Sequence, residues 1–198
     1  MDLEYQKWAD NGYKTKNMNF RKEEPFIILE DDITPAINLK NYLDFSKILV
    51  ETGTCFGEGV KRALDAGYTD VRSVEIVEDR FNSCADRFKN DKRVTLWCGD
   101  TRNNLYDMIP EEPIVILLDA HPSGEGSGGH NELIKDGYDS EFAQQNVLVA
   151  EIKIILKTGH RHIILIDDTN TIDQAYTELL DNYKFEVIGD KYLECIPL

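Results

Sequence analysis

The chain has 198 residues, 41% hydrophobic and 30% charged, and its 37 acidic and 22 basic residues give a formal net charge of −15. This length suffices for a sizeable core, and so negative a charge disfavours nucleic-acid partners, because phosphate neutralisation dominates their binding. The sequence shows neither an apolar run approaching the roughly eighteen residues of a membrane span nor a signal-peptide core, so we expect a cytoplasmic protein, in a cell or an infected host, without a membrane partner.

The first 45 residues differ in pattern from the remainder. Residues 1–45 are polar with scattered aromatic side chains and show no alternation of strand and helix patterns. We interpret them as an N-terminal cap segment, helical near 35–44, in front of one domain at 46–198.

From residue 46 onward, strand-like and helix-like patterns alternate regularly. The predicted strands are 47–51, 71–76, 93–98, 113–119 and 162–167. The predicted helices are 57–67, 78–89, 101–108, 141–157 and 171–182, and two short strands are expected within 184–197. Such alternation predicts an α/β fold of the doubly wound, Rossmann-like kind, in which a mostly parallel sheet carries helices on both faces.

Acidic residues stand at or just after the ends of the predicted strands. They are Glu51, Glu75, Asp100, Asp119, Asp167 and Asp168. In an open parallel sheet the carboxyl ends of the strands share one edge, where ligands bind. The sequence therefore predicts six carboxylates around one crevice, an arrangement that needs a cation or hydrogen-bond donors to compensate its charge.

A glycine-rich turn joins the first strand to the first helix. It reads ETGTCFGEG from Glu51 to Gly59 and includes Gly53, Thr54 and Gly57. Glycines let a ligand approach the main chain closely, and the following helix offers free N–H groups at its start. The turn lacks the third glycine of a dinucleotide site and the G-K-[ST] of a P-loop. Its acidic flanks favour a cationic, phosphate-free ligand such as S-adenosylmethionine.

Three segments taken in order, ETGTCFGEG, VEIVED and WCGDTRNNL, resemble the motifs of class I S-adenosylmethionine-dependent methyltransferases. The resemblance covers residues 46–198. It implies that the turn residues surround the methionine part of the donor, that Glu75 accepts the ribose hydroxyls and that Asp100 lies near the adenine.

The segments LLDAH and LIDDTN are similar to the metal sites of catechol-type and macrocin-type O-methyltransferases. That resemblance implies Asp119, Asp167 and Asp168 as ligands of Mg²⁺, which prefers hard oxygen donors. An aspartate of the pair at 167–168 could instead cap the following helix. The catechol type has a lysine shortly after its first metal aspartate, and AHPSG at 120–124 lacks one, which favours a sugar, glycan or other polyol acceptor over a catechol.

Histidine suits proton transfer near neutral pH, and His121 is our candidate for the general base, close to Asp119. Two alternatives stay open at this point. A metal-independent methyltransferase would use Asp119 and His121 on another small molecule or a protein side chain, and a non-catalytic scaffold would only bind nucleosides. We also expect that the chain could form a homo-oligomer.

Overall fold

The computed structural model describes residues 37–120, 140–167, 180–188 and 192–198, with side chains in the helix at 140–157 described from Val147 onward. The helical elements are η2 (Leu39–Tyr42, a 3-10 helix), α2 (Glu58–Ala66), α3 (Glu78–Phe88), α4 (Thr101–Met108) and α6 (Ser140–Lys157). The strands are β1 (Ile48–Thr52), β2 (Asp70–Glu75), β3 (Val94–Cys98), β4 (Val115–Leu118), β5 (Ile163–Ile166), β6 (Tyr183–Ile188) and β7 (Tyr192–Pro197). Among these described helices, none has the length and apolar character needed to cross a membrane.

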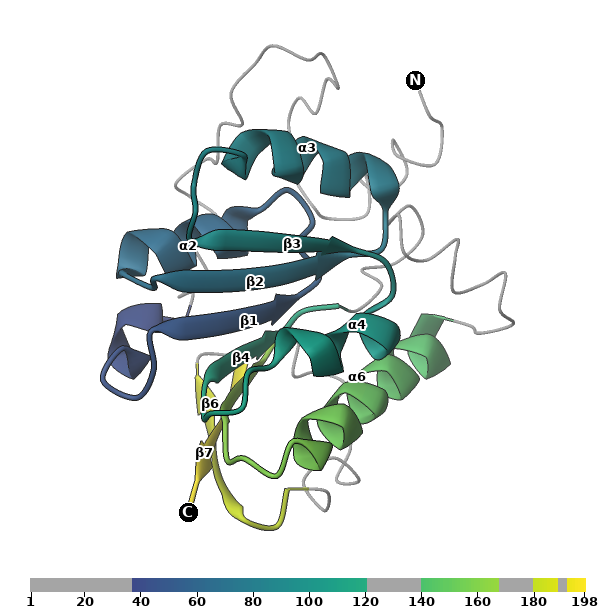
Figure 1. Ribbon diagram of the computed structural model, residues 1–198. Coiled ribbons are helices and arrows are strands. Elements are labelled where there is room, and N and C mark those ends of the chain that lie inside the picture. The colour runs from purple at the N-terminus through teal and green to yellow at the C-terminus, as the bar shows by residue number, and fades with distance from the viewer. Residues whose placement is uncertain (1–36, 121–139, 168–179, 189–191) are drawn as a thin grey trace.

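The strands form one seven-stranded sheet in the order β3-β2-β1-β4-β5-β7-β6. The first five pair in parallel, whereas β7 runs antiparallel to both β5 and β6. In Figure 1 the arrowheads of β1, β2 and β3 point to the same side of the molecule. The predicted strands and the doubly wound sheet are therefore confirmed, and the tail forms the two short strands expected from its sequence.

Helices cover both faces of this sheet, as predicted. On one face α4 and α6 pack together over side chains such as Val50, Ile116 and Ile164 (Figure 1). On the other face α2 covers Leu49, Leu117 and their neighbours. The central strands β4 and β5 are buried along their whole length, which accounts for their unbroken apolar sequences.

The bounds of the helices follow from local chemistry. Helix α2 lies between two glycines in the left-handed conformation, Gly57 (φ 80°) and Gly67 (φ 116°), a conformation that suits a glycine C-cap. Asp100 caps α4 by accepting a hydrogen bond from the amide of Arg102 at 2.8 Å. The predicted helix at 171–182 falls mostly outside the described residues.

The segment before β1 belongs to the core where it is described. Helix η2 occupies part of the range 35–44 in which the sequence predicted a helix, and its Leu39 and Tyr42 are buried with residues of α2 and β1. Residues 1–36 lie outside the described part of the chain, so the boundary of the cap segment at residue 45 stays a prediction.

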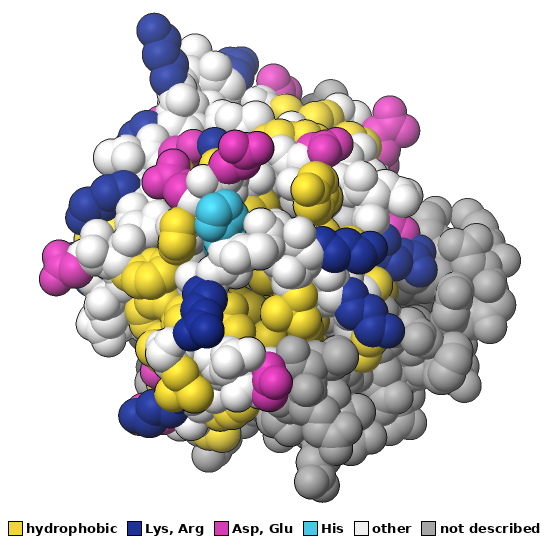
Figure 2. All heavy atoms as spheres, turned by 60° about the horizontal axis from the view of Figure 1, so that its bottom comes forward, with side chains coloured by type: hydrophobic (Ala, Val, Ile, Leu, Met, Phe, Trp, Pro, Cys, Tyr) yellow, Lys and Arg dark blue, Asp and Glu magenta, His cyan; other side chains and the backbone are white. Residues whose placement is uncertain are grey.

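The sheet ends at β6, on whose outer surface Val187 is 60% exposed. Figure 2 views the molecule from the bottom of Figure 1 and shows apolar side chains there interspersed with lysines and arginines. The predicted homo-oligomer is not tested by these features and stays a prediction.

Candidate functional site

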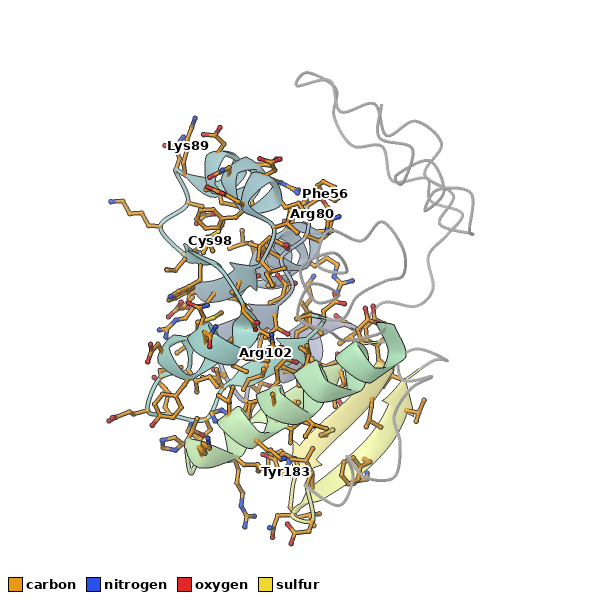
Figure 3. All side chains as sticks on the ribbon, turned by 90° about the vertical axis from the view of Figure 1, so that its right-hand side faces the viewer. Phe56, Arg80, Lys89, Cys98, Arg102 and Tyr183 are labelled. Carbon is orange, nitrogen blue, oxygen red and sulfur yellow. The ribbon has the colours of Figure 1, made fainter. Side chains whose placement is uncertain are left out.

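The parallel register brings the ends of four strands to the same level. Thr52 pairs with both Val74 and Leu118, and Leu118 pairs with Ile166. The next residues along these strands are Glu75, Gly53, Asp119 and Asp167, so they follow one another across the carboxyl edge of the sheet. We call this edge the rim; Figure 3 looks toward it.

The glycine turn brings β1 close to β4. Gly53 has φ 82°, and a Cβ added there would lie 2.4 Å from the carbonyl oxygen of Asp119. Only glycine avoids both the strained conformation and the backbone contact. The turn is held from the other side by two hydrogen bonds to the Val74 carbonyl, from the amides of Gly53 (3.0 Å) and Thr54 (3.1 Å). The glycine turn and the end of β4 therefore form one closely packed junction.

Glu51 lies deeper than the sequence prediction placed it. Its carboxylate is 1% exposed and occupies the space where a Cβ of Gly59 would stand, 1.6 Å from Oε1. Ser73 donates a hydrogen bond to Glu51 Oε2 at 2.7 Å, which leaves Thr54 to donate to Ser73 at 2.6 Å. Burial raises the pKa of Glu51 to about 7, while Ser73 and the nearby Arg62 oppose this shift.

The predicted crevice of six carboxylates therefore needs one correction, because Glu51 and Thr54 are enclosed beneath the turn. Both are more than nine-tenths buried, and their polar atoms bind to one another through Ser73. A contact of either residue with a donor stays a prediction, and in this structure they support the turn from inside.

Glu75 is positioned across the glycine turn. Its Oε2 accepts a hydrogen bond from the amide of Cys55 at 2.7 Å, and its Oε1 accepts one from the amide of Val77 at 2.9 Å. Burial raises the pKa of the Glu75 carboxyl, whereas these amides and the guanidinium of Arg80 favour its charged form. The amide of Ile76 also favours the charged form, and Glu75 is only 4% exposed, so the predicted contact of its carboxylate with ribose hydroxyls stays a prediction.

Asp100 makes contacts that its sequence position alone did not predict. Besides capping α4, its carboxylate accepts hydrogen bonds from the side chain of Arg102, including one of 2.9 Å from Nε to Oδ2. An adenine amino group would compete with Arg102 for the same oxygens. The predicted contact between Asp100 and adenine stays a prediction, and forming it would weaken the ion pair between Asp100 and Arg102.

Arginine side chains supply much of the positive charge that these carboxylates need, for which the sequence predicted a cation or hydrogen-bond donors. Arg62 stands near Glu51, Arg80 near Glu75, and Arg102 pairs with Asp100. Arg80 also lies over the ring of Phe56, 5.4 Å from its centroid, and Figure 3 shows the two together at the rim. The sequence carried a signal for two of them, because Arg80 lies in the first turn of α3 and Arg62 in the second turn of α2, and each helix follows a strand that ends at or just after an acidic residue.

On the other half of the rim, two of the proposed metal ligands come together. The amide of Asp119 donates to the carbonyl of Thr52 at 3.1 Å, and the amide of Asp167 donates to the carbonyl of Leu118 at 3.0 Å. Asp119 and Asp167 thus stand side by side at neighbouring strand ends, both half-buried. Asp168 and His121 lie outside the described residues. Within the described ranges, no group of three or more His, Cys, Asp or Glu residues is arranged to hold a metal ion.

No protein-family model matches the chain, and no curated protein sequence matches it significantly. Solved structures do match. An O-methyltransferase from Bacillus cereus in complex with SAH is 12% identical, with a TM-score of 0.52, and the match covers 100% of this chain and 92% of that one. A candidate methyltransferase from Streptococcus mutans, also in complex with SAH, is 12% identical, with a TM-score of 0.54, and the match covers 81% of this chain and 98% of that one.

The chain has the class I methyltransferase fold. In this fold the observed sheet order places the glycine turn and Glu75 on one side of the junction at Gly53, and Asp119 with Asp167 on the other. The rim therefore has two parts, which we call the donor half (the glycine turn and Glu75) and the acceptor half (Asp119 and Asp167) after the roles predicted from the sequence; those roles stay predictions.

Proposed function

We propose that the chain is an S-adenosylmethionine-dependent O-methyltransferase that acts, with the assistance of Mg²⁺, on a hydroxyl group of a sugar or glycan. The observation that carries the proposal is the anchoring of Glu75 across a glycine turn, at the rim of a class I methyltransferase fold. The strongly negative chain favours a small acceptor over a polyanion. We place this activity in the cytoplasm.

The donor half of the rim is suited to an adenosine that carries positive charge. We propose that Glu75, which backbone amides hold across the turn, accepts the two ribose hydroxyls. Gly53 and Gly57 hold the turn in left-handed conformations, packed against Asp119 and Phe88, and so fix the backbone that we propose surrounds the methionine part of the donor. The acidic residues around this half of the rim, among them Glu75 and Asp100, favour the sulfonium and ammonium groups of the donor over a phosphate.

In the acceptor half, Asp119 and Asp167 fit a hard divalent cation, because they offer carboxylate oxygens from adjacent strand ends. We propose these two residues, together with Asp168, as its ligands. Bound there, Mg²⁺ would act as a Lewis acid that lowers the pKa of the acceptor hydroxyl.

The chain itself contributes orientation and a path for the proton. The acceptor oxygen forms a bond to the methyl carbon while the carbon–sulfur bond breaks, and its electron pair stays on sulfur as a neutral thioether. Holding the two reactants in line removes much of the entropic barrier. The hydroxyl proton leaves to a base, for which we propose His121, two residues after Asp119 in the sequence.

Two measurements test the function. Isothermal titration with SAH should show binding, and Glu75→Gln should weaken it, with Glu78→Gln as a control on the exposed start of α3; no heat at high micromolar SAH would favour a scaffold instead. A mass-spectrometric screen of saccharides with S-adenosylmethionine should detect a gain of one methyl group that EDTA abolishes and Mg²⁺ restores. Turnover that is unaffected by EDTA would favour the metal-independent alternative.

A further inference from the structure

A polar cluster is buried behind the rim, on the face of the sheet covered by α4 and α6. It consists of Glu151 from α6, Thr52 at the end of β1 and Thr101 at the start of α4, which are 1%, 0% and 6% exposed. The helix surface around Glu151 is otherwise apolar, with Ile152 and Ile155 fully buried. A carboxyl group in such surroundings is costly to bury unless its oxygens are satisfied.

Within the described part of the molecule, some oxygen atoms of this cluster lack a hydrogen-bond partner. Glu151 Oε1 and Thr101 Oγ1 are both buried and have no hydrogen-bond partner there. Burial raises the pKa of Glu151 to about 8 and the charge of Asp100 adds to this, while the neighbouring hydroxyls of Thr101 and Thr52 lower it. Unsatisfied buried polar groups are rare in native proteins and call for an explanation, such as a bound water or a functional role.

Thr52 connects this cluster to the acceptor half of the rim. The amide of Asp119 donates to the Thr52 carbonyl at 3.1 Å and also approaches the Thr52 hydroxyl oxygen at 3.2 Å. A hydroxyl that accepts from an amide keeps its own proton free to donate, and the carboxyl of Glu151 is the neighbouring acceptor. Thr52 therefore lies between the carboxyl of α6 and the backbone of Asp119, and a hydrogen bond from its hydroxyl to Glu151 would join the two.

The same cluster touches the donor half. Thr52 directly precedes Gly53, and Thr101 directly follows the cap residue Asp100. Helix α6 thus reaches, through one side chain, the ends of three elements that form the rim.

We propose that Glu151 is a positioning residue, which fixes the backbone of Asp119 relative to the donor turn through the hydroxyl of Thr52. Its purpose rests on the proposed methyl transfer, since a displacement of about 1 Å between reacting groups can cost on the order of a hundredfold in rate. The proposed hydrogen bonds, from Glu151 through the Thr52 hydroxyl to the Asp119 amide, form a link that can be tested without donor, acceptor or metal.

The test is amide hydrogen exchange of the full chain by NMR, comparing wild type with Glu151→Leu, Glu151→Gln and Ile155→Ala. The last variant is the control, because Ile155 lies one turn along the same buried helix face and truncating it costs packing without touching the link. After normalisation to the exchange of core amides in β5, the Asp119 amide should exchange about tenfold faster in Glu151→Leu. It should stay at the wild-type rate in Ile155→Ala, and Glu151→Gln, which keeps an acceptor for Thr52, should restore it.

An unchanged Asp119 amide in Glu151→Leu, or an equal acceleration in Ile155→Ala, would overturn the proposal. If Glu151→Leu does not fold, a carbon-13 titration of the Glu151 carboxyl decides the matter. Thr52→Val should raise its pKa further and Thr52→Ser should return it, whereas an identical pKa in all three chains would show that no link exists. A wild-type chain that does not bind SAH would refute the proposed function and leave the exchange result intact.

Discussion

The buried carboxyl of Glu51 makes a quantitative prediction about stability. Its pKa is about 7 in the folded chain, against an ordinary value of 4.5, and burial is the main cause. Between these values the folded state binds more protons than the unfolded state, so the stabilising effect of the protonated carboxyl is complete below pH 4.5 and is lost as the pH rises through 7. A difference of 2.5 in pKa corresponds to about 3 kcal/mol.

The perturbation is Glu51→Gln, which keeps the shape of the side chain and an oxygen that can accept from Ser73. Urea unfolding, followed by tryptophan fluorescence, gives the free energy of unfolding at pH 5 and pH 8. Wild type should lose about 3 kcal/mol more than the variant between these two conditions. Glu151 titrates in the same range, but it is present in both chains and cancels from the comparison.

Ser73→Ala is the matched control, since it removes a hydrogen bond that favours the charged form of Glu51. This variant should therefore show a steeper loss between pH 5 and pH 8 than wild type. If wild type and Glu51→Gln lose the same free energy over this interval, Glu51 ionises normally and our account of the enclosed carboxylate is wrong.

Three further predictions concern other parts of the fold. Glu75→Ala should weaken SAH binding about 10- to 100-fold in a calorimetric titration, and unchanged affinity would contradict the ribose assignment. Gly53→Ala should lower the free energy of unfolding by more than about 2 kcal/mol, because a Cβ would meet the Asp119 carbonyl, whereas Gly159→Ala, with φ 73° and no atom within 4 Å, should cost only about 1 kcal/mol of backbone strain. Burial lowers the pKa of His162 to about 4, so wild type should lose about 3 kcal/mol of stability relative to His162→Gln as the pH drops from 6.5 through 4, and an equal change in both chains, followed by circular dichroism, would refute this.

The sheet could be predicted from the sequence because its signals are local. Apolar runs such as PIVILL (113–118) are too short for helices and end at acids, and five of them alternating with helical patterns admit few topologies. The register that sets Asp119 beside Asp167 follows from this topology, since parallel strands end at a common edge.

The details of the site depend on side-chain directions, which a strand pattern does not determine. Asp100 was expected at the adenine, which stays a prediction, and it also binds Arg102, two residues later, because a cap geometry brings both to the first turn of α4. Glu51 was expected to line the crevice and is enclosed against Gly59, which becomes visible only once the turn is folded.

Glu151 was missed although the sequence carried a signal for it. It shares a helical spacing with the buried residues Val147 and Ile155, four positions before and after it, so it falls on an apolar stripe. A lone acid at such a position predicts a buried carboxyl. Nothing in the linear sequence, however, indicates that Thr52 and Thr101 meet it there.

The contact of Gly53 with the Asp119 carbonyl has a consequence for how the two parts of the rim can move. The turn proposed to bind the methyl donor and the strand end proposed to bind the acceptor touch directly, backbone against backbone, at this contact. Neither side of this contact can therefore shift alone, because a displacement of the turn at Gly53 presses directly on the backbone at Asp119.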